Sequence, residues 1–323
     1  MTMFNRIPTV LMSQEIIDKC FSRASKIEEP YQLKVEEKIR KEIIDRISTI
    51  ESISCGHLDK LVKKFPKIED VHPFYRDLLD LLFDIDHYKI SLYKMSETSI
   101  NIVKFSTIYI RKAKGAQKAE DLNRIMRAYY GRFSSLINDL KKDLEFLREC
   151  RDYMSRIPTI DTRVLTFIIS GMPNVGKSSL IRSITNTNPK VAQYPFTTQS
   201  IHVGVLDIDN ERFQLVDTPG ILDRPMEERN EMEIKAIMAL KHIDGIIMFL
   251  FDYSESSGYS VQDQEKLYDE IVRTFRKPII RVQTKSDLGP DIREKIAVST
   301  MTGDGLEDLK RKMFEFRVIH SAY

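Results

Sequence analysis

Residues 171–178 read GMPNVGKS and match the phosphate-binding pattern G-x-x-x-x-G-K-[ST]. The preceding residues 164–170, VLTFIIS, form a short apolar, β-branched run that predicts a buried strand, and the following SLIRSIT predicts a helix. A strand, a glycine-rich loop and a helix form the context in which this pattern holds phosphate groups. The alternative is a chance match in a glycine-rich turn, and the motifs farther along the chain argue against it.

The residue types in this loop suit phosphate chemistry. Gly171 and Gly176 let the backbone fold closely around phosphate oxygens, while the loop N–H groups and the helix N-terminus supply positive partial charge. We expect Lys177 to neutralise the β- and γ-phosphates and the Ser178 hydroxyl to ligate Mg²⁺. The predicted phosphate loop comprises Gly171, Met172, Pro173, Asn174, Val175, Gly176, Lys177, Ser178 and Ser179.

Three further motifs follow in chain order, each behind a predicted strand. They are DTPG (Asp217, Thr218, Pro219, Gly220), TKSD (Thr284, Lys285, Ser286, Asp287) and the start of STMTGDG (Ser299, Thr300, Met301). Any one of these short motifs is also typical of an ordinary turn. Their order and spacing together predict a GTP-binding domain.

The chemistry of these motifs indicates which ligands to expect. The Asp217 carboxylate can hold Mg²⁺ through water, and the Gly220 N–H can meet a γ-phosphate. The two carboxylate oxygens of Asp287 suit the paired N–H donors of guanine, which adenine lacks, and the Lys285 stem can lie over the base. The turn at 299–301 can present a backbone N–H to the guanine carbonyl. We therefore predict GTP and Mg²⁺ as ligands.

YPFTT at 194–198 lies where a GTPase keeps its first switch segment, between the phosphate loop and DTPG. We predict that Phe196, Thr197 and Thr198 contact the nucleotide, with Thr198 as the Mg²⁺ ligand and the sensor of the γ-phosphate. An ordinary exposed loop is the alternative. Lys177, Thr198 and Gly220 would then act together on the reacting phosphate.

Hydrolysis of GTP needs positioning and charge neutralisation rather than covalent chemistry. Ile221 stands where many GTPases have a water-orienting Gln, and its side chain cannot hydrogen-bond a water molecule. Related GTPases with Asn at the place of Asn174 can bind K⁺ beside the phosphates. We expect slow intrinsic hydrolysis that K⁺ or a partner raises. A GTP-binding scaffold with negligible turnover is the alternative.

Strand and helix signals divide the chain into two domains, which gives the fold class α + α/β. Residues 12–155 are almost free of strand signals, and helically spaced stripes, breaks at Pro66 and Pro73, and a break or bend at Gly115 predict an antiparallel helical bundle over 1–158. The stripes are Leu78, Leu81, Leu82 and Ile85, and Leu136, Leu140, Leu144 and Leu147. Residues 159–323 predict a P-loop GTPase domain with a three-layer α/β fold.

The predicted sheet of the GTPase domain is six-stranded and mostly parallel. Its strands are expected at 164–170, 201–208, 212–217, 245–252, 278–284 and 296–299. Only Asp209, Asn210 and Glu211 join the second and third of these strands, and this link is too short for a crossover. That pair should form a hairpin that gives the sheet one antiparallel edge.

Several stretches resemble known families. GMPNVGKSS, YPFTT, DTPGILD and TKSD resemble the Obg-type GTPases of the translation-factor class. RIPTV at 6–10, FPKIEDVHPFYRDLLDLLFDIDHYK at 65–89 and SRIPTID at 155–161 resemble the nucleolar GTP-binding protein family. The resemblance covers nearly the whole chain and implies a helical domain ahead of a GTPase domain, with a role in assembly of the large ribosomal subunit. The early end of the chain resembles the short archaeal form.

Two positions depart from the pattern of these families. Thr284 stands where most GTPases have an Asn that ties the loop back to the phosphate loop, and its hydroxyl can do part of that work. Thr300 stands where Ala is commoner, and little effect is expected because the contact there comes from the backbone.

Composition and charge limit the kinds of partner that the protein can have. The net charge is only +2, but residues 1–160 carry 29 Lys and Arg against 24 Asp and Glu, whereas the rest carries 21 against 24. The three cysteines, the lack of an apolar signal core and the short apolar runs predict a cytoplasmic protein without membrane association. A membrane-remodelling or signalling GTPase is disfavoured because no lipidation motif is present.

A basic run at 104–133 is the candidate contact for RNA. Its cations are Lys104, Arg111, Lys112, Lys114, Lys118, Arg124, Arg127 and Arg132, and the aromatic residues Tyr109, Tyr129, Tyr130 and Phe133 are interleaved in the run. Cations reach backbone phosphates and aromatic rings can stack on unpaired bases, so the run suits rRNA of a large-subunit precursor, with no DNA partner expected. The alternative is a solvated helix face whose aromatic side chains pack inward.

Overall fold

The computed structural model describes residues 3–28, 34–185, 190–194, 200–218, 220, 222–289 and 291–320. The chain folds into two compact units. One unit contains Met3–Asp70 and Phe83–Ser155, and the other contains Val71–Leu82 together with the chain from Arg156 on. None of the helices within the described ranges is both long and apolar enough to cross a membrane.

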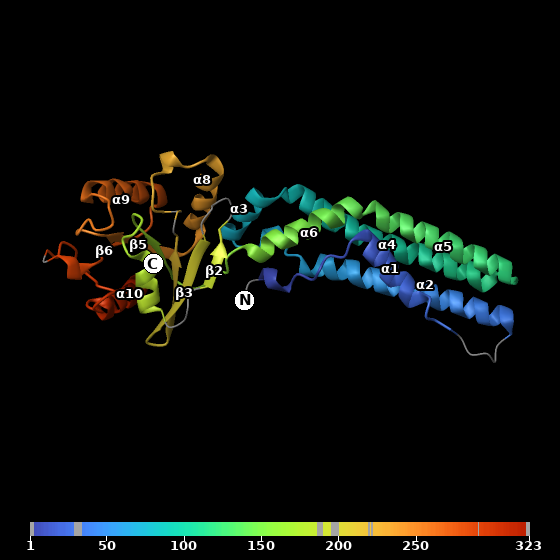
Figure 1. Ribbon diagram of the computed structural model, residues 1–323. Helices are drawn as coiled ribbons and strands as arrows, with labels where there is room; N and C mark the ends of the chain where they lie inside the picture. Colours follow the sequence, from blue (N-terminus) through green and yellow to red (C-terminus); the bar gives the residue numbers. More distant parts are fainter. Residues whose placement is uncertain are drawn as a thin grey trace. The chain divides into compact units, whose positions relative to one another are not determined.

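The first unit is helical (Figure 1). Its α-helices are α1 (Ser13–Ala24), α2 (Val35–Lys64), α4 (Ile85–Gly115), α5 (Ala119–Asp139) and α6 (Lys141–Arg156), with short 3-10 turns η1 (Met3–Arg6) and η2 (Ile68–Asp70). The long helix α2 packs against α1, α4 and α5. Ile43, Ile47 and Ile50 recur at helical spacing on its buried face, which explains this packing.

Each leucine stripe crosses a break between two helices, so neither lies on a single helix. The first stripe spans the end of α3 (Pro73–Leu82) and the start of α4, where Asp84 caps the new helix by accepting from His87 N at 2.9 Å. The second spans α5 and α6, with Leu140 at the junction. The apolar period continued across these junctions, so periodicity alone gave no sign of them.

Two of the aromatic side chains listed for the basic run lie in the protein core. Tyr129 and Phe133 are fully buried, and their rings lie 6.4 Å apart in the core of the helical unit. The eight cations of the run are all exposed. The stacking role predicted for the aromatic residues is therefore wrong for Tyr129 and Phe133, which pack inward.

Helix α3 packs within the second unit, although it lies early in the sequence. Its neighbour there is α8 (Glu231–Ala239). The Tyr75 hydroxyl donates to Ile160 O at 2.6 Å and accepts from Ile160 N at 2.8 Å. A segment that the sequence division at residue 158 assigns to the helical domain thus contributes to the GTPase unit.

The second unit is built around a six-stranded sheet in the order β2-β3-β4-β1-β5-β6. The strands are β1 (Thr166–Ser170), β2 (Lys190–Gln193), β3 (Ser200–Ile208), β4 (Glu211–Asp217), β5 (Gly245–Phe251) and β6 (Ile279–Gln283). Strands β4, β1, β5 and β6 are parallel, while β2, β3 and β4 pair antiparallel. The predicted mostly parallel sheet with an antiparallel edge is confirmed.

Helices cover the sheet on both faces, as a three-layer fold requires. Besides α8, they are α7 (Lys177–Ile184), α9 (Val261–Phe275) and α10 (Leu306–His320), with the 3-10 turns η3 (Met226–Glu228), η4 (Leu240–His242) and η5 (Ser286–Leu288). Figure 1 shows α9 and α10 on opposite sides of β5 and β6. Strand β5 is buried at every residue, as expected for an apolar strand between two parallel neighbours.

Two details of the sheet differ from the sequence prediction. The segment 296–299 forms only one isolated bridge, between Ala297 and Gln283, because the chain turns away at Ser299. The sixth strand is instead β2, a short polar edge strand without an apolar signal. The predicted hairpin of β3 and β4 is confirmed, and Asp209 and Asn210 adopt the positive φ angles, +49° and +65°, that suit a two-residue hairpin turn.

Candidate functional site

The phosphate-loop motif joins β1 to α7 through backbone that only small or adaptable residues accept. Gly171 has φ +134°, and a Cβ there would lie 2.6 Å from Leu250 O on the neighbouring strand. Gly176 has φ +101° immediately before α7, and Asn174 has φ +62°. The left-handed conformations explain the glycines at both ends of the motif.

Lys177 is held in the centre of this loop. The residue is 6% exposed, and its ammonium group donates to Gly171 O and Met172 O, both at 2.8 Å. Burial lowers the pKa of Lys177, and the charges of Asp223 and Asp217 partly oppose that shift. The ammonium is therefore fixed at the loop by two backbone carbonyls.

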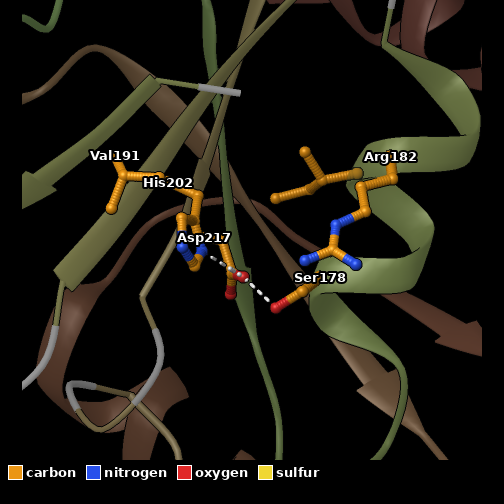
Figure 2. Close-up of a pocket in the computed structure, with 6 residues that line it drawn as sticks. Ser178, Arg182, Val191, His202 and Asp217 are labelled. Atoms are coloured by element: carbon orange, nitrogen blue, oxygen red, sulfur yellow. Dashed lines mark hydrogen bonds and ion pairs between the residues drawn. The ribbon is translucent and has the colours of Figure 1, made fainter. Parts of the chain in front are cut away.

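Ser178 and Asp217 meet at the predicted Mg²⁺ site, as Figure 2 shows. Ser178 Oγ donates to Asp217 Oδ2 at 2.6 Å, and His202 Nδ1 on β3 lies 3.3 Å from the same oxygen. Asp217 is fully buried, and its Oδ1 has no hydrogen-bond partner among the described residues. An orphaned carboxylate oxygen beside a serine hydroxyl fits Mg²⁺, which takes oxygen ligands and keeps several waters.

The DTPG turn begins where β4 ends. Thr218 Oγ1 donates to Ile169 O at 2.9 Å, which ties the turn to β1. Gly220 has φ +70°, and its N–H, predicted to meet a γ-phosphate, donates to Asp223 Oδ2 at 2.6 Å. The predicted site residues Pro219, Phe196, Thr197 and Thr198 and the neighbouring Ile221 lie outside the described residues.

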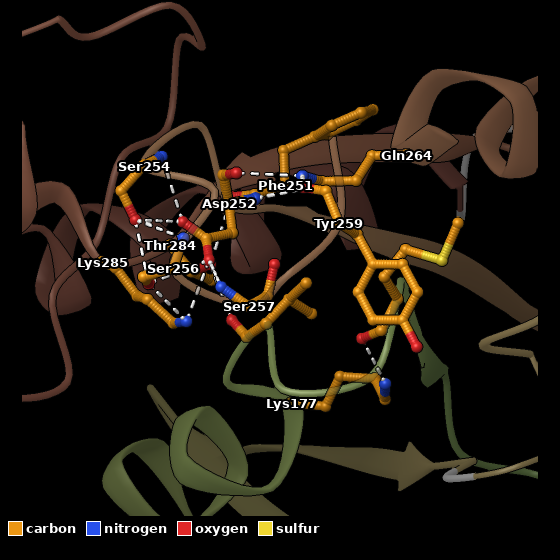
Figure 3. Close-up of polar contacts among 12 residues, drawn as sticks. Lys177, Phe251, Asp252, Ser254, Ser256, Ser257, Tyr259, Gln264, Thr284 and Lys285 are labelled. Atoms are coloured by element: carbon orange, nitrogen blue, oxygen red, sulfur yellow. Dashed lines mark hydrogen bonds and ion pairs between the residues drawn. The ribbon is translucent and has the colours of Figure 1, made fainter. Parts of the chain in front are cut away.

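The TKSD loop is tied to the phosphate loop through the hydroxyl of Thr284, as expected from the sequence. Thr284 Oγ1 donates to Val175 O at 2.7 Å and lies 3.1 Å from Phe251 O at the end of β5. Lys285 has φ +53°, and its ammonium donates to Asp252 Oδ2 at 2.9 Å (Figure 3). Asp287 is exposed at the start of η5, where its carboxylate can reach a ligand.

The last motif forms a tight turn beside the TKSD loop. Ser299 Oγ accepts from the N–H groups of Met301 and Thr302, both at 3.2 Å. Ser286 N donates to Val298 O at 3.2 Å and so connects the two loops. Met301 is 86% exposed and Thr300 is half-buried, so hydrogen bonds rather than burial organise this turn.

Hydrogen bonds therefore connect the described parts of all four motifs. Thr218 joins the DTPG turn to β1, Thr284 joins the TKSD loop to the phosphate loop, and Ser286 joins it to the STMTGDG turn. Motifs more than a hundred residues apart are thus gathered at the carboxyl ends of the parallel strands, where open α/β sheets bind ligands.

Both parts of the chain match known protein families. Residues 4–161 match the family described as the NOG1 N-terminal helical domain, and residues 166–285 match the one described as 50S ribosome-binding GTPase. The crystal structure of a nucleolar GTP-binding protein 1 from Plasmodium falciparum is 33% identical, covering 51% of this chain and 92% of that one, with a TM-score of 0.47. The chain belongs to the nucleolar GTP-binding protein family.

Curated members of the family are similar over most of the chain. Nucleolar GTP-binding protein 1 of Encephalitozoon cuniculi is 37% identical over 88% of this chain and 54% of its own length. The Saccharomyces cerevisiae protein of the same name is 36% identical over 87% of this chain and 44% of its own length. The chain thus spans about half the length of the curated family members it matches.

Three residues near the predicted site were missed by the sequence analysis. His202 contacts Asp217, Asp223 contacts Gly220, and Asp252 contacts Lys285. Asp252 carried a usable signal, since it is a carboxylate directly after the buried strand β5, whose carboxyl end faces the site. Asp223 lies within the quoted DTPGILD stretch, but nothing in that stretch indicates its partner. His202 carried no signal, because its contact is set by strand pairing.

Proposed function

We propose that this chain binds GTP with Mg²⁺ and hydrolyses it to GDP and phosphate. The observation that carries the proposal is the hydrogen bond from Thr284 to Val175 O, which ties the guanine-recognition motif to the phosphate loop. A nucleotide bridging these two loops would place its base at Asp287 and its phosphates at Lys177. Equilibrium binding of GTP against ATP tests the proposal directly.

Catalysis would rest on positioning and charge. Lys177 and the loop N–H groups would neutralise the β- and γ-phosphates, and Gly220 N–H would meet the γ-phosphate. Ser178 and Asp217 would hold Mg²⁺, which supplies further charge neutralisation when bound, and Thr198 would complete the metal site. The first switch segment at 194–198 and the DTPG segment at 217–220 would be ordered by the γ-phosphate and released after hydrolysis.

We further propose that the protein acts in the cytoplasm on a precursor of the large ribosomal subunit. The similarity to nucleolar GTP-binding proteins and to a family described as 50S ribosome-binding supports this role. The exposed cations of the basic run at 104–133 support contact with rRNA through the helical domain, since cations bind backbone phosphates.

Turnover is expected to depend on the monovalent cation. Asn174 is exposed in the phosphate loop with φ +62°, and its side-chain oxygen can ligate K⁺ beside the phosphates. Hydrolysis should be about tenfold faster in KCl than in NaCl at equal ionic strength, which corresponds to roughly 1.4 kcal/mol of transition-state stabilisation. Phosphate release under steady-state conditions measures the ratio.

Two variants make this measurement specific. Asn174→Ala should erase the difference between the salts, whereas Asn210→Ala, at an Asn of similar φ in the β3–β4 turn, should keep it. Equal rates of the unaltered protein in both salts would contradict K⁺ activation and leave an external activator as the explanation.

A GTP-binding scaffold with negligible turnover is the second candidate function. It is favoured by Ile221, which stands where many GTPases have a water-orienting Gln. Single-turnover hydrolysis on assembling large subunits separates the two, because a scaffold would retain GTP under conditions in which a switch converts it to GDP.

A further inference from the structure

A buried carboxylate lies beside the TKSD loop and belongs to none of the nucleotide motifs. Asp252 follows β5 directly and is fully buried. It accepts hydrogen bonds from Ser254 N at 3.1 Å, Ser257 N at 2.8 Å, Ser256 Oγ at 3.1 Å and the Ser254 hydroxyl. Burial raises the pKa of Asp252, but the hydrogen bonds from Ser254 and Lys285 outweigh it, so the group is a buried anion.

The same carboxylate anchors Lys285. The ammonium group donates to Asp252 Oδ2 at 2.9 Å and to Ser256 Oγ at 2.8 Å, as Figure 3 shows. The preceding residue is held by the same end of β5, because Thr284 N donates to Phe251 O at 2.8 Å. Two consecutive residues of the TKSD loop are thus fixed by two consecutive residues at the end of β5.

The two hydrogen bonds of the Lys285 ammonium restrain a side chain that is otherwise flexible. Ordering a lysine side chain costs rotamer entropy, and an unanchored Lys285 would sample many conformations before a base could rest on its stem. The ion pair with Asp252 holds the ammonium in one place, and the side chain keeps 24% of its surface exposed. A flat base could lie on the apolar stem of this partly exposed side chain.

We propose that Asp252 is a positioning residue for guanine recognition, which it serves by holding the Lys285 stem as a platform for the base. The proposal rests on the GTP-binding function proposed above. A platform contacts the face of the base, whereas Asp287 reads its edge. Loss of Asp252 should therefore weaken GTP, GDP and inosine triphosphate by the same factor, because all three present a purine face.

The test is binding of these three nucleotides, with Mg²⁺, to the full chain. Asp252→Asn should weaken each about tenfold, a typical loss for a hydrogen bond to a charged group. Lys285→Met keeps an apolar stem without the anchored ammonium and should weaken them similarly. Asp308→Asn is the matched control, since it removes an exposed carboxylate paired with Arg311 on α10.

A double-mutant cycle separates positioning from a merely structural role. In a Lys285→Ala background, Asp252→Asn should change nucleotide affinity little, because no platform remains to be held. Full additivity would overturn the proposal, as would wild-type affinity in Asp252→Asn or Lys285→Met. Failure of the unaltered protein to bind GTP would instead overturn the underlying function.

A second, independent observation concerns Asp223 in the DTPG segment. Its Oδ2 accepts from Gly220 N at 2.6 Å and lies 3.9 Å from the Lys177 ammonium, and the residue is 8% exposed. Gly220 N–H and Lys177 are two of the groups that the proposed function assigns to the γ-phosphate. A carboxylate oxygen of the protein therefore occupies the Gly220 N–H and lies close to Lys177, whose ammonium donates to Gly171 O and Met172 O.

We infer that Asp223 competes with the γ-phosphate and so biases the protein towards GDP. The inference again rests on the proposed GTP site. GDP has no γ-phosphate and can bind while Asp223 keeps Gly220, whereas GTP must displace a carboxylate and bring its own negative charge close to it. The affinity for GTP would then be the balance between the contacts that the γ-phosphate gains and the contact between Gly220 and Asp223 that is lost.

The affinity ratio of a non-hydrolysable GTP analogue to GDP measures this competition. Asp223→Ala should raise the ratio about tenfold in favour of the analogue, and Asp223→Asn should raise it less because the amide oxygen still accepts from Gly220. Glu228→Ala removes an exposed carboxylate of the same segment and should leave the ratio unchanged. An unchanged or lowered ratio in Asp223→Ala would overturn the inference, even if both nucleotides bind well.

Discussion

Changing Asp287 to Asn should weaken GTP binding by at least about a hundredfold and make the protein prefer xanthosine triphosphate, because one acceptor of the carboxylate becomes a donor. Guanine offers two neighbouring N–H donors, which the two oxygens of Asp287 match. Xanthine has a carbonyl in place of the guanine amino group, so the amide NH₂ of Asn can donate to it. Asp287 is exposed, so its carboxylate is free to meet the base.

Competition binding with GTP, ATP and xanthosine triphosphate measures this switch. Asp291→Asn is a suitable control, because it makes the same chemical change on a nearby carboxylate that is 77% exposed and 3.8 Å from Arg293. The control should keep its preference for GTP. If the unaltered protein bound ATP as well as GTP, the assignment of guanine to this site would be wrong.

The sequence predicted best those features that are encoded locally. The phosphate loop, the β3–β4 hairpin and the strand before each of the first three motifs were predictable because a short stretch carries both the conformation and the chemistry. The hydrogen bond between Thr284 and Val175 O was also predictable, although 109 positions separate the two residues, because a recognised motif implies its tertiary partner.

Features that depend on tertiary context were not predictable from one sequence. The sequence predicts helix α3 as part of the helical domain. In the structure it belongs to the GTPase unit, where Tyr75 hydrogen-bonds Ile160 and the helix packs on α8. The short edge strand β2 has no apolar signal, since an edge strand can be held by ladder hydrogen bonds alone. The partners of Asp223 and Asp252 likewise depend on how distant segments meet.

Replacing Arg124, Arg127 and Arg132 together by Gln should weaken binding to large-subunit particles by roughly a hundredfold at moderate salt and lower the salt slope by about two to three. Each phosphate contact releases counterions from the RNA when it forms. With three contacts fewer, fewer counterions are released, so the affinity and the steepness of its salt dependence should fall together. All three arginines are exposed on α5. Arg124 also pairs with Asp121 at 2.9 Å, but at 78% exposure that ion pair is weak and can yield to a phosphate.

Cosedimentation with large-subunit particles measures the affinity and its salt slope. It is carried out over a range of salt concentrations, in GDP and in a non-hydrolysable GTP analogue. GTP affinity should be unchanged, since the three residues lie outside the nucleotide motifs. Neutralising Lys235, Lys241 and Arg273, three exposed cations of the GTPase unit, makes the same charge change elsewhere and should have a smaller effect. If the α5 variant cosediments like the unaltered protein at every salt concentration, the basic run is a solvated face and the RNA contact lies on another surface.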